Sequence, residues 1–137
     1  MTLKVTDAGG QNLLNVLFGA TAKATTFTLQ LFTDSNALAD TDTNTTHTVA
    51  TGGGYADKPL TNNATVALNG GIPEAVWGAQ TFTFTGALTT NPTIKGYQVL
   101  AGTTLLFEEL ITNFTPANNG DTLTLTPKFQ AGNGAPA

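Results

Sequence analysis

The segment 39–51, ADTDTNTTHTVAT, gathers the residue types most able to carry out chemistry: two aspartates, an asparagine and the only histidine of the chain. Asp40, Asp42 and Asn44 have the i, i+2, i+4 spacing of the first three ligands of an EF-hand calcium loop. The rest of that motif is missing, because threonine stands at the sixth and twelfth positions, where the loop needs glycine and glutamate. We therefore predict a polar loop whose Asp and Asn side chains bond their own backbone, and no metal ligands.

The candidate nucleophiles are equally sparse. His47 and Ser35 are the only histidine and serine, so a Ser–His–Asp triad would need both, and no nucleophile-elbow pattern surrounds Ser35. The absence of cysteine excludes thiol nucleophiles, disulfides and zinc–thiolate sites. A single histidine also excludes a metal centre with several histidine ligands. Threonines on both sides of His47 predict a solvated histidine at a strand edge. We expect no catalytic residue, no cofactor and no enzymatic activity.

Paired carboxylates could hydrolyse glycosides if two of them faced each other across a groove. Glu108 and Glu109 are adjacent, so on a strand their side chains point to opposite faces and one must face inward or lie at an interface. Pairing with Lys95, on the preceding strand, is the expected structural role. Trp77 is the only tryptophan, and no aromatic platform for a sugar is evident. These features do not favour a glycosidase.

Strand patterns dominate the elements that must position these residues. Apolar and polar residues alternate in FTLQLFT, ATVALN, TFTFTGAL and DTLTLTPKF. IKGYQVL and TTLLFEELI, separated by Ala101-Gly102, predict a β-hairpin. Pro127 ends the last strand or places it at a sheet edge. The fold class is therefore all-β: an antiparallel β-sandwich or jelly-roll-like barrel with at most one short N-terminal helix.

One segment, QNLLNVLFGATA, has helical rather than strand periodicity. Gly9-Gly10 precedes it and Gly19 follows, which suits a short helix, although a strand remains an alternative. The apolar residues at helical spacing are Leu13, Leu14, Leu17 and Phe18. We predict these four as an interface with a partner protein or with another subunit, in a segment that either packs on its own domain or reaches a neighbouring subunit.

The 137 residues predict one domain. We expect an N-terminal arm or short helix over 1–25, a β-sandwich over 26–129 and a flexible tail over 130–137. Only 10% of the residues are charged, against about 25% in a typical soluble domain. The five scattered lysines, the lack of arginine and the net charge of -4 disfavour nucleic-acid binding. No apolar run is long enough to span a membrane, and the N-terminus lacks a secretory signal pattern.

Four stretches of the chain, taken in order, are TATGGGYADKPLT, QTFTFTGALTTNPTIKGYQV, TTLLFEELI and PANNGDTLTLTPKF. Together they resemble a family of small bacteriophage virion structural proteins. The resemblance covers about residues 26–129. Gln98 and Phe107 depart from it, standing where the family pattern has an aromatic residue and a tryptophan.

The resemblance implies a capsid decoration, or cement, protein that is made in the host cytoplasm and binds the exterior of the assembled virion. Its partner would be the major capsid protein, and self-association, as a trimer, is expected around capsid symmetry axes. The alternatives are a tail, fibre or head–tail component and, in a different class, a carbohydrate-binding β-sandwich module.

Overall fold

The computed structural model describes residues 2–61 and 64–131, and these form ten strands and one helix. The helix α1 spans Asp7–Phe18. The strands are β1 (Thr2–Val5), β2 (Thr26–Phe32), β3 (Lys58–Thr61), β4 (Thr65–Asn69), β5 (Ile72–Val76), β6 (Gln80–Thr83), β7 (Ile94–Ala101), β8 (Thr104–Phe114), β9 (Thr122–Leu125) and β10 (Lys128–Gln130).

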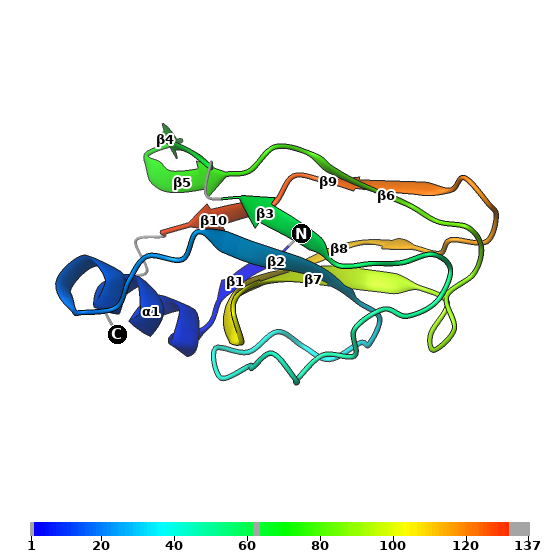
Figure 1. The fold of residues 1–137 in the computed structure, drawn as a ribbon, viewed down its shortest axis with the longest axis horizontal. Coiled ribbons are helices and arrows are strands. Elements are labelled where there is room, and N and C mark those ends of the chain that lie inside the picture. Colours follow the sequence, from blue (N-terminus) through cyan, green and yellow to red (C-terminus); the bar gives the residue numbers. More distant parts are fainter. Residues whose placement is uncertain (1, 62–63, 132–137) are drawn as a thin grey trace.

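The strands form three antiparallel sheets. The largest has the order β1-β8-β7-β2-β3, and the smaller ones have the orders β10-β5-β4 and β6-β9. Figure 1 shows the small sheets on one side of the five-stranded sheet and residues 33–48, the first part of the long loop between β2 and β3, on the other. The predicted all-β, sandwich-like fold with a single short helix is thus confirmed over the described residues. That helix, of 12 residues, is too short to cross a membrane, and the described part of the chain contains no other.

The core lies between the five-stranded sheet and the two small sheets. Because side chains alternate along a strand, Leu29, Leu31 and Val99 face inward from β2 and β7. Phe82 on β6 and Trp77 just after β5 close the core from the other layer. The alternation predicted in TFTFTGAL is therefore confirmed for Phe82.

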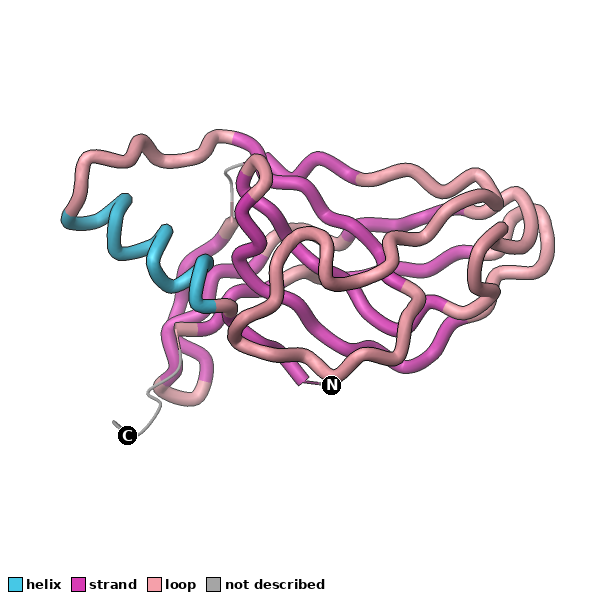
Figure 2. Tube along the Cα trace, turned by 90° about the horizontal axis from the view of Figure 1, so that it is seen from below, coloured by secondary structure: helices cyan, strands magenta, loops and turns pink. Residues whose placement is uncertain are grey.

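The opposite face of the five-stranded sheet carries a row of polar side chains. The strand register aligns Lys4 on β1, Glu108 on β8, Gln98 on β7 and Gln30 on β2. Residues 33–48, the first part of the loop 33–57 that joins β2 to β3, run across this face, as Figure 2 shows, whereas Ala50 and Tyr55 of the same loop pack in the core. A polar row normally faces water, but here the loop covers it, and Gln98 and Glu108 are fully buried.

The strands β1, β3 and β5 were not predicted, and the single last strand predicted over DTLTLTPKF is interrupted at Thr126-Pro127, so that β9 and β10 belong to different sheets. Within the expected arm 1–25, residues 2–5 form β1, which pairs with β8 at the sheet edge. The predicted helix is confirmed but begins earlier, so that Gly9 and Gly10 lie inside it. The hairpin at Ala101-Gly102 is confirmed, with Gly102 at a φ of 61° in the turn. Of the expected tail 130–137, Gln130 belongs to β10, and residues 132–137 lie outside the described residues.

Candidate docking surface and a buried polar cluster

The large apolar side chains exposed in the described residues gather at one end of the molecule, on α1, β4 and β5. Phe18 is 84% exposed and Val66 is 76% exposed. Figure 1 shows that these three elements share one end of the sandwich. We call this surface the apolar end, and its residues are Leu13, Leu14, Leu17, Phe18, Val66, Leu68 and Ile72.

Local contacts fix α1 at this end. Thr6 caps the helix, because its Oγ1 accepts a hydrogen bond from the Gly9 backbone N–H at 3.0 Å. The same hydroxyl donates to the Leu105 carbonyl oxygen and so ties the helix start to β8. Gly9 packs against β8 so closely that a Cβ atom there would lie 2.0 Å from the Leu106 carbonyl oxygen. The start of α1 is therefore anchored, while its apolar C-terminal half faces solvent.

A groove of about 600 Å³ separates α1 from β4 and β5. Leu13 and Leu17 line it from the helix, and Val66 lines it from β4. Its floor includes Trp77 and Phe107, whose stacked rings have centroids 6.0 Å apart. The walls are apolar and exposed while the floor belongs to the core, so a partner side chain that entered this groove would contact the core directly.

The sequence singled out the helix side of this surface but missed the other side. Leu13, Leu14, Leu17 and Phe18 lie together on α1, as their spacing predicted. Val66 and Leu68 share a face of β4, also as predicted, but that face is exposed. An alternating pattern identifies a face without saying what covers it, so only the structure brings the two sets together.

The histidine contradicts the prediction. His47 was expected at a solvated strand edge, yet it is only 4% exposed. It belongs to the loop 33–57 and stacks on Phe32, with ring centroids 4.2 Å apart. Phe32 can approach because Gly96, opposite it on β7, has no side chain: a Cβ there would lie 2.2 Å from the Phe32 ring. The polar segment that contains His47 therefore folds back onto the sheet instead of projecting into water.

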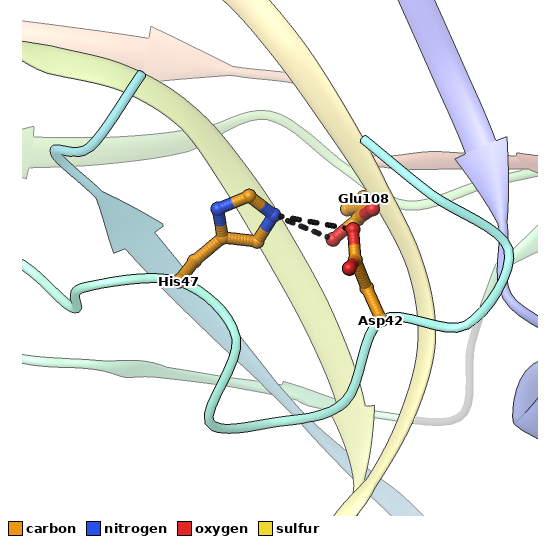
Figure 3. A group of neighbouring side chains, drawn as sticks. All are labelled: Asp42, His47 and Glu108. Atoms are coloured by element: carbon orange, nitrogen blue, oxygen red, sulfur yellow. Dashed lines mark ion pairs between the residues drawn. The ribbon is translucent and has the colours of Figure 1, made fainter. Parts of the chain in front are cut away.

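Three carboxylates surround the imidazole, as Figure 3 shows in part. The Nδ1 atom of His47 lies 2.8 Å from Asp34 Oδ1. On the other side, Nε2 lies 3.2 Å from Glu108 Oε2 and 3.6 Å from Asp42 Oδ2. Neither contact of Nε2 has hydrogen-bonding geometry, and both Glu108 oxygens also lack a hydrogen-bond partner among the described residues. We call these four residues the His47 cluster.

Electrostatics couples these groups. Burial alone would lower the pKa of His47, but the carboxylates of Glu108 and Asp34 outweigh it and raise that pKa to about 9. Burial raises the pKa of Glu108, and the nearby Asp42 adds to this effect, while His47 opposes it. For Asp34, hydrogen bonds from His47 and from two backbone N–H groups exceed the effect of burial and lower the pKa. In the absence of any other ligand, the histidine is thus a cation held between carboxylates.

The two adjacent glutamates point to opposite faces, as predicted, but neither is paired with Lys95 in the described structure. Glu108 faces His47, whereas Glu109 faces the core side and accepts a hydrogen bond from the Tyr97 hydroxyl. The backbone register explains the difference, because Tyr97 lies directly opposite Glu109 on β7. Ser35 has no part in the cluster, and no Ser–His–Asp arrangement is formed by the described residues.

Asp40 and Asp42 also separate. Asp40 is an exposed residue that pairs with Lys4 at 2.7 Å, whereas Asp42 turns inward toward His47. The EF-hand spacing therefore does not bring Asp40 and Asp42 to one site.

Comparison of the chain with protein-family models, with curated proteins and with solved structures finds no match. Its function is therefore inferred from its own residues.

Proposed function

We propose that this chain is a bacteriophage capsid decoration protein that docks on the major capsid protein through the apolar end. The observation that carries the proposal is the gathering of the exposed large apolar side chains on α1, β4 and β5. Exposed apolar surface concentrated in one region is typical of protein-binding sites. The sequence resemblance to small virion structural proteins supplies the kind of partner.

The chemistry of the surface supports a partner that is a protein. Phe18 and Leu14 could enter apolar pockets of a capsid subunit and act as anchors, because large buried side chains carry most of the energy of an interface. The chain has no arginine and few charged residues, so charge-assisted hydrogen bonds would contribute little. Binding would then depend mainly on apolar and backbone contacts.

A carbohydrate-binding module is disfavoured by the position of Trp77. A sugar platform needs an aromatic face open to solvent, but Trp77 is 7% exposed, and its Nε1–H donates to the Thr61 carbonyl oxygen at 2.9 Å. The aromatic residue left exposed at the apolar end is a single one, Phe18, which does not make a platform. A glycan array should therefore give no signal.

A tail, fibre or head–tail component could use the same apolar surface. The two virion functions differ in stoichiometry, because a decoration protein occupies many equivalent places on the shell. If the protein forms a trimer, contacts between its copies would either occupy the apolar end, in competition with the capsid, or use another surface and leave the apolar end free. Sedimentation of the free protein, before and after Phe18→Asp, would show whether Phe18 contributes to contacts between copies.

The direct test compares two single substitutions that each add one negative charge. Phe18→Asp changes the apolar end, and Asn119→Asp changes the exposed turn between β8 and β9, which Figure 1 places at the other end of the molecule. We expect Phe18→Asp to lower occupancy on capsids at least about tenfold, the loss of about 1.4 kcal/mol. Because Phe18 is so exposed, the free energy of unfolding should change by less than about 0.5 kcal/mol.

Equal occupancy of the two variants would contradict docking through the apolar end. Deleting the residues of β1 and α1 is not a suitable test. Val5 packs against the core, and β1 pairs with β8 along its full length. Such a deletion would expose the edge of the five-stranded sheet and would confound loss of binding with loss of the fold.

A further inference from the structure

We propose that Asp42, His47 and Glu108 form a binding site for one divalent transition-metal ion of the zinc class. Their ligand atoms, one nitrogen and two carboxylate oxygens, lie within 4.8 Å of one another. Figure 3 shows His47 and Asp42 reaching inward from the loop 33–57 and meeting Glu108 on β8. A bound ion would fasten this loop to the five-stranded sheet, a role separate from docking at the apolar end.

The spacing of the ligand atoms fits tetrahedral coordination. Bonds of about 2.0–2.2 Å at tetrahedral angles place neighbouring ligand atoms about 3.3–3.6 Å apart. Nε2 of His47 lies 3.2 Å from Glu108 Oε2 and 3.6 Å from Asp42 Oδ2. With one ligand atom from each of Asp42, His47 and Glu108, the fourth tetrahedral position would be left for a non-protein ligand such as water.

Buried polar atoms without partners also point to a ligand at this place. Glu108 is 0% exposed, and neither its carboxylate oxygens nor His47 Nε2 has a hydrogen-bond partner in the described residues. Buried polar atoms are normally satisfied, and a set that converges on one point indicates a missing ligand. Buried charge of this kind is stabilised by pairing or by a metal. When ionised, the carboxylates of the His47 cluster would bear three negative charges, of which a divalent cation would offset two.

The groups behind the ligands are arranged as in histidine–metal sites. Asp34 Oδ1 lies 2.8 Å from His47 Nδ1, so Nδ1–H can donate to it and leave Nε2 free to bind the ion. Asp34 itself accepts from the backbone N–H of Asn36 at 3.0 Å and from that of Thr48. Asp42 Oδ2 is fixed by the Ala39 N–H at 2.7 Å. Asp34 is thus a positioning residue, and the other three are the ligands.

The donor set selects the class of ion. Imidazole suits zinc, copper, iron and nickel, whereas calcium takes about six to eight oxygen ligands. Two carboxylates and one imidazole on a closed face cannot supply that number of oxygens. Calcium should therefore leave the melting temperature unchanged, while zinc should raise it by several degrees.

The experiment uses the full chain without a polyhistidine tag, stripped with a chelator and titrated with Zn²⁺ by calorimetry. We expect one ion per chain. Asp42→Asn and Glu108→Gln should each weaken binding at least about 100-fold, and Asp34→Asn about 10–100-fold, as for other groups that orient a metal ligand. The matched control is Asp40→Asn, which makes the same change two residues away, on the exposed side of the loop; it should alter the affinity less than about threefold, under 1 kcal/mol.

A second measurement covers variants that fail to fold. His47 is the only histidine, so its two ring nitrogens give an unambiguous pair of ¹⁵N resonances in the unmodified chain. Zinc should shift the Nε2 resonance strongly and leave Nδ1 protonated. Zinc binding without that shift would mean an adventitious surface site and would overturn the proposal. Absence of saturable binding at millimolar zinc, or an Asp40→Asn loss equal to that of Asp42→Asn, would overturn it as well.

Discussion

At the scale of single residues, the His47 cluster is unusual because most of its ionisable side chains are buried, although they come mainly from a polar loop segment. Three ionisable side chains of the loop 33–57 meet Glu108 on β8, and the ring of His47 stacks on that of Phe32. A buried ion pair is weak evidence for stability, because desolvation offsets its Coulomb energy. Breaking one is costly, however, at about 3–5 kcal/mol, since the remaining charge stays buried without a partner. The position of the loop 33–57 on the sheet therefore depends on the protonation state of the His47 cluster and on any ligand that the cluster binds.

The metal-free protein should lose stability as the pH rises from about 6.5 to about 9. The folded-state pKa of His47 is raised to about 9 from an unfolded value of 6.5. The folded state therefore holds a proton that the unfolded state has released, so this contribution is complete below pH 6.5 and is lost above it. At about 1.4 kcal/mol per pKa unit, the loss is at most about 3 kcal/mol. Glu108, whose pKa is also raised, acts in the same sense from lower pH, and Asp34, whose pKa is lowered, loses its contribution only in acid.

Urea denaturation with a chelator present, at several pH values across this window, measures the effect. His47→Gln removes the titrating group and should flatten the profile. A profile of the unmodified chain that is flat, or that rises with pH, would show that the carboxylates do not hold the imidazole as a cation.

At the scale of elements, the position of α1 depends on a glycine that the sequence alone does not distinguish from its neighbour. A Cβ at Gly9 would lie 2.0 Å from the Leu106 carbonyl oxygen, whereas a Cβ at Gly10 would meet no atom within 4 Å. Gly9→Ala should therefore push α1 away from β8 and lower the free energy of unfolding by about 1–3 kcal/mol. Gly10→Ala should raise it by about 0.5–1 kcal/mol, because alanine favours a helix. Thermal unfolding of both variants tests this, and a similar effect of the two would contradict the close packing of the helix.

Some strands could be predicted because their own residues form a strand pattern. Others could not, because they depend on pairing with residues far away in the sequence. The strand β2 was recognised from its alternating pattern, and β7 and β8 were recognised as two long runs separated by the short turn at Ala101-Gly102. In contrast, β1 has only four residues, and β3 and β5 contain Pro59 and Pro73, which argue against strands. These three strands form because they pair with strands elsewhere in the chain, and their own residues do not indicate that pairing.

The same distinction separates the two candidate sites. The helix half of the apolar end was predictable, because Leu13 and Leu17 repeat at helical spacing. The burial of His47 was not, because it depends on Phe32, on Glu108 in a distant strand and on the missing side chain of Gly96. Alternating threonines around a histidine look the same in a solvated strand and in a covered loop.

At the scale of the whole molecule, the chain has an apolar end on α1, β4 and β5 and a charge-poor body. Apolar docking predicts that capsid binding depends little on salt. Between 50 and 200 mM salt, a ligand that neutralised six to ten phosphates would lose about 10³–10⁵ in affinity; we expect a change below about tenfold here. A steep salt dependence in a pelleting assay with purified capsids would point to a charged partner instead.

Repeated attachment would compensate for weak individual contacts. If copies associate on the shell, each bound copy raises the effective concentration of the next site, so total avidity can exceed the affinity of one contact. The protein could then stabilise a capsid while each apolar end binds only modestly.

The central claim is that this protein decorates and stabilises a capsid. The most direct test is to measure heat-driven genome release from particles assembled with and without the protein, while counting its copies per particle. We expect hundreds of copies, and particles without the protein should release their genome at a lower temperature; Phe18→Asp particles should behave like those that lack it. Equal release temperatures, together with only a few copies per particle, would contradict the claim and favour a tail or fibre component.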